Sequence, residues 1–218
     1  MPRTGRPRRD GRAVAGDPTD EILRAAAHLF EELGVGGTTM ARIAADAGLG
    51  QSSLYYYFRS KEEIVAELVA RANVVPLKLG ASLTRWDGSP AAKLYLFVKG
   101  DVEALCALPF DINEAHRIAA RDRERFAPYW SERRRLEKLL GAIVRAGITA
   151  GELRDVDPSL TALTLMSNDE GVQNWYRLGS NRKPAVAAQA LAEMMIGGLL
   201  TRKRSLGDVA KEADQAEL

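Results

Sequence analysis

Helix-start signals recur along the whole chain and constrain its fold more than any other sequence feature. A proline occupies the first helical position after Asp17, Ser89, Asp157 and Lys183. Proline is favoured there because its fixed φ suits the first turn and its missing N–H would have no partner in the helix. Apolar residues at helical spacing follow these signals, whereas strand-like alternation between hairpin turns is absent from the sequence. The pattern therefore predicts an all-α fold of about nine helices.

The spacing of these signals also suggests how the chain is organised. A first helix is expected from Pro18 to Gly34, a short second one after Thr39, and a long fourth one after the capping box at 60–63. We expect a disordered basic arm, a small domain, a larger domain and a disordered tail. Their expected ranges are residues 1–17, 18–64, 65–204 and 205–218.

Composition excludes several classes of protein. Cys106 is the single cysteine, so the chain can form neither an internal disulfide framework nor a multi-cysteine metal site. The N-terminus lacks an apolar signal region, and no window approaches the ~20 apolar residues of a membrane span. We therefore expect a cytoplasmic protein with no membrane partner, no metal and no cofactor.

The small net charge of +2 is unevenly distributed. Residues 1–61 contain nine Lys/Arg and seven Asp/Glu, and residues 62–218 contain twenty-two of each. The excess lies in the first quarter of the chain, much of it in the segment MPRTGRPRRDGR. Such a segment is either a solvated tail or a contact with an acidic partner.

Residues 39–58 have the pattern of a helix-turn-helix. Ala44 is small where two helix axes must approach closely, and Gly48, four residues later, suits a turn that requires a positive φ. Consecutive helical residues point about 100° apart, so at least one of the three tyrosines at 55–57 must be exposed. The supporting apolar positions are Ile43, Ala47, Leu49 and Leu54.

The stretch TTMARIAADAGLGQSSLYYYFRSKEEI, residues 38–64, resembles the TetR family of bacterial transcriptional regulators, and the resemblance extends back through ILRAAAHLFEELG. It implies an N-terminal three-helix helix-turn-helix DNA-binding domain and a larger α-helical domain for ligand binding and dimerisation. The implied partners are double-stranded DNA with an inverted-repeat operator, a small-molecule effector and a second copy of the chain. The family's commoner mode is repression, relieved when a small, largely apolar effector releases the protein from its operator.

The resemblance also assigns DNA contacts by position. The third helix would lie in the major groove, where glutamine and serine side chains read base edges and tyrosine hydroxyls bond phosphates. For Tyr55, partial burial is the alternative to a base contact. The segment Gly5-Arg6-Pro7 resembles an AT-hook core, which lies in the minor groove. The assigned residues are Thr39, Arg42, Gln51, Ser52, Ser53, Tyr55, Tyr56, Tyr57 and Lys61, with Arg6 and Arg8 in the arm.

Effector and dimer contacts are expected in the larger domain. Asn168 and Asp169 follow Leu165 on an apolar stripe, where polar groups need an arginine, the dimer mate or a ligand as partner. Core packing is the alternative for the aromatic candidates. The candidate pocket residues are Leu94, Phe97, Phe110, Trp130, Met166, Asn168, Asp169 and Trp175. The last long helix carries an apolar stripe that a monomer would expose, so we expect a homodimer through Ala188, Leu191, Ala192, Met195, Ile196 and Leu199.

Two other functions compete with that of an effector-controlled repressor. An enzyme could use Cys106 and His116 as nucleophile and base, but no glycine-rich nucleophile elbow or orienting third group accompanies them. We therefore predict that the protein is not an enzyme. A constitutive DNA-binding dimer without an effector is the second alternative.

Overall fold

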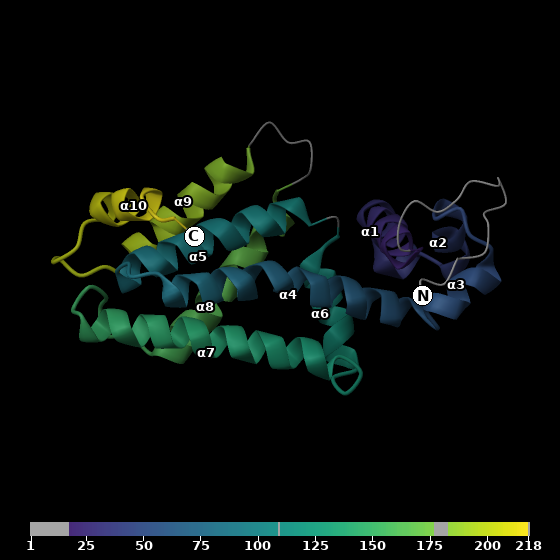
Figure 1. The fold of residues 1–218 in the computed structure, drawn as a ribbon, viewed down its shortest axis with the longest axis horizontal. Coiled ribbons are helices and arrows are strands. Elements are labelled where there is room, and N and C mark those ends of the chain that lie inside the picture. Colours follow the sequence, from purple (N-terminus) through teal and green to yellow (C-terminus); the bar gives the residue numbers. More distant parts are fainter. Residues whose placement is uncertain (1–17, 109, 177–182, 218) are drawn as a thin grey trace. The chain divides into compact units, whose positions relative to one another are not determined.

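The structure is a computed structural model that describes residues 18–108, 110–176 and 183–217 (Figure 1). Within these ranges it contains ten α-helices, one short 3-10 helix and no strand beyond an isolated bridge between Leu153 and Leu200. The all-α fold expected from the sequence is therefore confirmed. The expected basic arm, with Arg6 and Arg8, lies outside the described residues.

The chain forms two compact units. Of the described residues, the first unit contains 18–71 and 110–126, and the second contains 72–108, 127–176 and 183–217. From the sequence, the boundary was expected at 64/65 and residues 110–126 were assigned to the larger domain. In the structure, this segment instead packs with the N-terminal helices.

The first unit is built on three N-terminal helices: α1 (Pro18–Gly37), α2 (Met40–Asp46) and α3 (Gln51–Tyr57). The first part of α4 (Lys61–Arg85) and the helix α6 (Ile112–Arg121) complete it. Gly34 has φ 70° and ψ 162°, so the helix end expected there is a break inside α1. The side chains that fill this core include Ile22, Phe30, Ile43, Leu54 and Ile64.

The second unit is organised around α5 (Pro90–Ala107), which contacts α7 (Ala127–Thr149), α8 (Pro158–Glu170), α9 (Pro184–Gly197) and α10 (Leu206–Asp214). A 3-10 helix, η1 (Gly171–Asn174), continues α8. Figure 1 shows α9 and α10 lying against α5. Because α5 is covered by helices on several sides, most of its residues are buried, including Leu94, Phe97 and Val98.

Helix starts in both units use the caps that the sequence predicted. The Thr39 hydroxyl accepts the N–H of Arg42 at 3.3 Å, and an Asp157 carboxylate oxygen accepts the N–H of Leu160 at 2.7 Å. Ser89 caps α5 in the same way. These bonds satisfy main-chain donors that have no partner within the helix.

The expectation of a disordered tail after residue 204 is corrected by helix α10. Ser205 caps this helix, accepting the N–H of Asp208 at 3.1 Å, and Val209 and Ala213 are buried. An apolar stripe on one side of a polar segment is enough to dock a short helix against a neighbour.

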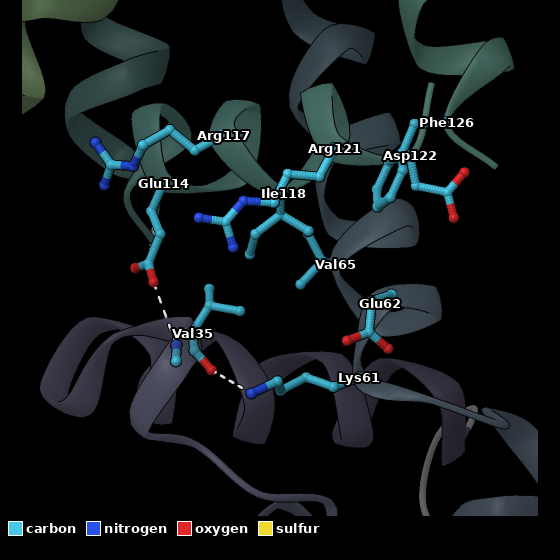
Figure 2. Close-up of a pocket in the computed structure, with 11 residues that line it drawn as sticks. Val35, Lys61, Glu62, Val65, Glu114, Arg117, Ile118, Arg121, Asp122 and Phe126 are labelled. Atoms are coloured by element: carbon cyan, nitrogen blue, oxygen red, sulfur yellow. Dashed lines mark hydrogen bonds between the residues drawn. The ribbon is translucent and has the colours of Figure 1, made fainter. Parts of the chain in front are cut away.

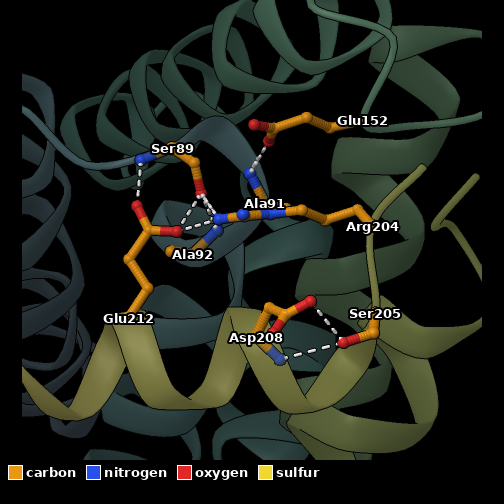
Figure 3. Close-up of polar contacts among 8 residues, drawn as sticks. All are labelled: Ser89, Ala91, Ala92, Glu152, Arg204, Ser205, Asp208 and Glu212. Atoms are coloured by element: carbon orange, nitrogen blue, oxygen red, sulfur yellow. Dashed lines mark hydrogen bonds and ion pairs between the residues drawn. The ribbon is translucent and has the colours of Figure 1, made fainter.

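Helix α10 is held to the start of α5 by polar contacts that the sequence did not suggest. The Glu212 carboxylate accepts hydrogen bonds from the main-chain N–H of Ser89 at 2.7 Å and from the Ser89 hydroxyl at 2.8 Å (Figure 3). Arg204 donates to the same carboxylate and to the Ser89 hydroxyl. Glu212 thus binds a helix N-terminus, where main-chain N–H groups favour a negative charge.

Candidate functional site

The turn between α2 and α3 has the geometry that the sequence predicted. Gly48 has φ 65°, a conformation that side chains other than glycine rarely adopt. The N–H of Leu49 donates to the carbonyl of Ala44 at 2.8 Å, and Ala44 is buried between the helices. The turn therefore sets the direction in which α3 leaves α2.

Helix α3 divides into a buried side and an exposed side. Leu54 is fully buried, and Phe58, which follows the helix, is also buried. Gln51 and Ser52 are exposed, and Ser53 and Tyr57 are half-buried. Tyr55 is 46% exposed and Tyr56 is 77% exposed. The exposed side therefore carries amide, hydroxyl and phenol groups that can donate and accept hydrogen bonds.

Two residues at the start of α2 are also accessible. Thr39 and Arg42 are both exposed. The Thr39 hydroxyl oxygen accepts the Arg42 N–H, which leaves its hydrogen available to donate to another group.

Lys61 has an intramolecular role that was not predicted from the sequence. Its Nζ donates to the main-chain carbonyl of Val35 at 2.6 Å (Figure 2). It also donates to the main-chain carbonyl of Thr38 at 2.9 Å. These carbonyls lie at the end of α1, where main-chain acceptors lack helical partners. The ammonium group therefore joins the start of α4 to the end of α1, with one of its three hydrogens remaining for a further acceptor.

Helix α6 is tied to the same part of the first unit. A Glu114 carboxylate oxygen accepts the N–H of Gly36 at 3.3 Å. After α6, Arg125 donates to the Ser60 hydroxyl at 3.1 Å and lies 3.7 Å from a Glu63 carboxylate oxygen. A partly open pocket of about 330 Å³ is lined by residues of α1, α4 and α6 and of the segment after α6. Figure 2 shows its lining side chains. Its wall includes the charged residues Lys61, Glu62, Glu114, Arg117, Arg121 and Asp122.

The predicted effector residues do not all lie together. Leu94, Phe97 and Met166 are buried in the second unit, whereas Phe110 is buried in the first. Trp130 is half-buried on α7, and Trp175 is 48% exposed.

The two polar candidates on α8 have different surroundings. Asn168 is exposed, and its amide donates to the carbonyl of Thr164 at 2.8 Å. Asp169 is fully buried. Both residues follow Leu165 on the same helix face, but only Asp169 is covered by neighbouring helices, whereas Asn168 lines an open pocket together with Leu165.

A buried charged cluster surrounds Asp169, and its other members were not predicted from the sequence. Asp101 on α5 and Glu170 on α8 are also buried, and Arg133 on α7 forms an ion pair with Glu170. The signal in the sequence was Asp101 itself, a carboxylate inside the largely apolar run LYLFVKGDVEALC, which also contains Lys99 and Glu103.

Burial changes the acidity of these carboxyl groups. Loss of hydration, together with the charge of Glu170, raises the pKa of Asp101 to about 7, and Arg133 opposes the rise. Burial, together with the charges of Asp101 and Glu170, raises the pKa of Asp169 well above its usual range. Burial also raises the pKa of Glu170, and Arg133 opposes that rise.

Comparison with known proteins identifies the family. The family model described as bacterial regulatory proteins, tetR family, matches residues 22–68. The model described as the C-terminal domain of tetracyclin repressor-like proteins matches residues 87–199, more than half of the chain. This protein belongs to the TetR family. It is a DNA-binding transcriptional regulator.

Individual TetR-family proteins resemble it over most of their length. The HTH-type transcriptional repressor KstR2 of Mycobacterium tuberculosis (strain ATCC 25618 / H37Rv) is 27% identical over 184 residues, covering 82% of this chain and 91% of KstR2. The solved structure of the ketosteroid transcriptional regulator KstR2 of Mycobacterium tuberculosis matches with a TM-score of 0.73 and 25% identity, over 87% of this chain and 98% of that one. AibR in complex with isovaleryl coenzyme A and operator DNA shares the fold, with a TM-score of 0.64 and 18% identity over 84% and 98% of the two chains.

The dimer stripe expected in this TetR-family chain is split by the fold. Ala188, Ala192 and Ile196 are buried inside the second unit, where α9 packs on α5, so they are not available to a partner. Leu191, Met195 and Leu199 are half-buried. The large apolar side chains exposed on α8 and α9 are Leu160 and Leu163 on α8 and Val186 and Met194 on α9.

An open pocket of about 360 Å³ lies between α8 and the end of α9. Met195 and Leu199 line it together with Leu160 and Leu165. On these two helices of the TetR-family chain, exposed apolar side chains therefore lie on both α8 and α9.

The environment of Cys106 does not favour nucleophilic chemistry. The side chain is buried, and loss of hydration raises the pKa of its thiol to about 11. Since the thiolate is the reactive form, this pKa disfavours a nucleophile–base pair with His116, the enzymatic alternative that the sequence left open. Among the described helices of this TetR-family protein, none is long and apolar enough to cross a membrane.

Proposed function

We propose that this protein is a repressor that binds an inverted-repeat operator as a homodimer and is released by a small, largely apolar effector. The observation that carries this proposal is the exposed side of α3, where Gln51, Ser52, Tyr55 and Tyr56 follow a helix-turn-helix bend. Polar side chains on the leading turn of such a helix suit the base edges of the major groove.

The proposed DNA contacts fall into two groups. Gln51, Ser52, Ser53 and Tyr55 read base edges, and the remaining groups hold phosphates. Phosphate contacts position the protein without carrying sequence information. The residues that contact phosphates are Thr39, Arg42, Tyr56, Tyr57 and Lys61. Arg6 and Arg8 in the arm reach the minor groove or phosphates.

Buried apolar residues in the second unit support the effector part of the proposal. Leu94 and Phe97 on α5 and Met166 on α8 lie on helices that contact each other. The similar protein KstR2 is described as a ketosteroid regulator, and AibR was solved with isovaleryl coenzyme A and operator DNA. Helix α4, which contributes to both units, provides a continuous covalent path by which an effector could alter DNA binding. The coupling between two such ligands is typically ~1–3 kcal/mol, and it is reciprocal.

Exposed leucine, valine and methionine side chains on α8 and α9 support the homodimer. Water-exposed apolar groups that gather on neighbouring helices mark an interaction surface. A two-fold dimer presents two copies of α3, so its site should be an inverted repeat with half-sites about 34–36 Å apart.

The test is selection of bound duplexes from a random DNA pool, followed by titration of the selected site. An inverted repeat should be enriched, and Gln51→Ala should reduce the preference for the selected site by ~1–3 kcal/mol while leaving binding to random DNA nearly unchanged. Gln215→Ala, an exposed glutamine at the end of α10, is the matched control. Equal affinity of the wild-type protein for selected and random DNA would refute the proposal.

A further inference from the structure

The buried charged cluster lies where three helices of the second unit meet. Asp101 is on α5, Arg133 is on α7, and Asp169 and Glu170 are at the end of α8. These helices contact one another pairwise. Asp101 and Glu170 are 7% and 8% exposed, and Asp169 is 0% exposed. Three carboxyl groups and one guanidinium are therefore held together in a largely dry part of the core.

The charges in this cluster do not balance. Arg133 forms an ion pair with Glu170, and the Arg133 guanidinium lies 5.8 Å from the centre of the Tyr129 ring. The positive charge of Arg133 is therefore already balanced by Glu170. The carboxyl groups of Asp101 and Asp169 are left to be neutralised by something else. Among the described residues, neither carboxylate oxygen of Asp169 has a hydrogen-bond partner. An unpaired buried carboxylate is so unfavourable that it must take up a proton or a cationic partner.

Helical register places apolar residues beside this cluster. Phe97 precedes Asp101 by one turn on α5, and Met166 precedes Asp169 by one turn on α8. Trp130 precedes Arg133 by one turn on α7. Residues three or four apart lie on the same face of a helix, so each apolar side chain adjoins a charged one. The arrangement resembles a ligand site with apolar walls and a few convergent polar groups.

We propose that Asp101 and Asp169 form the polar end of the effector site and take a ligand that carries a positively charged nitrogen on an apolar body. The inference rests on the proposed function, because it assigns the chemical class of the effector. A metal ion is not the cation that this site suits, since no three His, Cys, Asp or Glu side chains among the described residues are arranged to hold one.

Without a ligand, protons neutralise the two carboxyl groups, in keeping with a pKa of about 7 for Asp101 and a raised pKa for Asp169. The charged groups acting on this pair are Glu170 on the same helix as Asp169 and Arg133 on α7. When an ammonium group enters, a carboxylic acid gives its proton to solvent and the resulting carboxylate pairs with the ammonium. No other covalent bond forms or breaks, and binding exchanges one cation for another.

The experiment compares three probes with one apolar chain: octylammonium, 1-octanol and octanoate. Calorimetric titration in two buffers of different ionisation enthalpy measures affinity and proton release together. The proposal expects octylammonium to bind in preference to the other two probes and to release about one proton. Its affinity should rise by about tenfold per pH unit up to the pKa of the acid that is displaced.

Variants then locate the site on the two buried carboxyl groups. Asp169→Asn and Asp101→Asn should each weaken octylammonium binding by about tenfold or more, because each removes a carboxylate that pairs with the ammonium group. The variant that removes the acid displaced by the ammonium group should also lower the number of protons released. The control is Asp155→Asn, which changes an exposed carboxylate in the same unit and should leave binding unchanged.

Three results would overturn the inference: no preference for octylammonium over 1-octanol, binding without proton release, or equal binding by the Asp169→Asn and wild-type proteins. DNA binding, measured with the same preparations, distinguishes failure of this inference from failure of the proposed function. If the free protein binds its selected operator but ignores octylammonium, only the effector class is wrong. If it binds no preferred DNA site, the proposed function itself fails.

Discussion

At the scale of single residues, the buried carboxyl group of Asp101 links stability to pH. Its pKa is raised to about 7 in the folded protein, whereas an ordinary aspartate in the unfolded chain titrates at about 4. Between these values the folded state binds more protons than the unfolded state, so the free energy of unfolding falls as pH rises. Asp169 acts in the same direction, because its pKa is also raised.

We therefore predict that Asp101→Asn raises the melting temperature at pH ~7.5 and flattens its decline between about pH 4 and 7. A difference of one pKa unit between the folded and unfolded states corresponds to about 1.4 kcal/mol. The free energy of unfolding of Asp101→Asn should therefore exceed that of the wild-type protein by at least this amount at the upper end of the pH range. Calorimetric melting across the pH range measures the effect, with Asp155→Asn as the control. An unchanged pH profile for Asp101→Asn would show that this carboxyl group does not hold the extra proton.

Lys61 is the second residue whose effect can be predicted at this scale. Its ammonium group satisfies two carbonyls at the end of α1, so Lys61→Ala should lower the free energy of unfolding by about 1–2 kcal/mol. The same change should weaken binding to all DNA sequences similarly and reduce the salt slope by ~1 if the remaining hydrogen contacts a phosphate. Chemical denaturation measures the first effect and DNA titration the second. Lys138→Ala, a lysine on α7, is the control and should change neither.

At the scale of elements, α10 contributes to the stability of the second unit. Removing residues 206–218 would expose α5 where Val209 and Ala213 cover it and would leave the Ser89 N–H and Arg204 without the Glu212 carboxylate. We expect a loss of several kcal/mol, measured by thermal melting, since burial of two apolar side chains and a group of charge-assisted hydrogen bonds disappear together.

Two smaller changes test that expectation. Ending the chain after Asp214 keeps the whole helix and should preserve the melting temperature. Glu212→Gln keeps the shape of the side chain but removes its charge, so it should destabilise the protein by less than the full deletion. A full deletion as stable as the wild-type protein would show that α10 is only loosely attached.

At the scale of the whole molecule, the exposed apolar side chains of α8 and α9 predict the oligomeric state. A charge placed among them should be strongly unfavourable in a dimer interface and harmless in a monomer. We predict that Leu160→Glu converts the dimer to a monomer and weakens binding to the inverted repeat more than binding to a single half-site. Light scattering after size-exclusion chromatography measures the mass. Ala142→Glu, an exposed position on α7, is the control.

The N-terminal arm gives a further prediction at the same scale. Deleting residues 2–13 removes five arginines and no residue of the described core. We expect weaker DNA binding with a smaller salt dependence and an unchanged melting temperature, because each lost phosphate contact lowers the salt slope by about 0.9. Titrations at several salt concentrations measure the slope. Identical slopes for the full-length and shortened proteins would show that the arm makes no DNA contact.

The sequence by itself determined the features that depend on neighbours along the chain. Thr39, Ser89 and Asp157 were predicted as helix caps, and each accepts an N–H three residues ahead. Gly48 was predicted to need a positive φ, and it has one. These are short-range interactions, so the residues that make them are visible together in a window of a few positions.

Only the tertiary structure decided which partner covers each apolar face. Ala188, Ala192 and Ile196 form a stripe that a dimer partner could bury, but α5 of the same chain covers it. Glu212 meets Ser89, and the carboxyl group of Asp169 comes within electrostatic reach of Asp101, through contacts between segments far apart in the sequence. An apolar or charged pattern shows that a residue needs a neighbour, whereas the packing of whole helices determines which neighbour it receives.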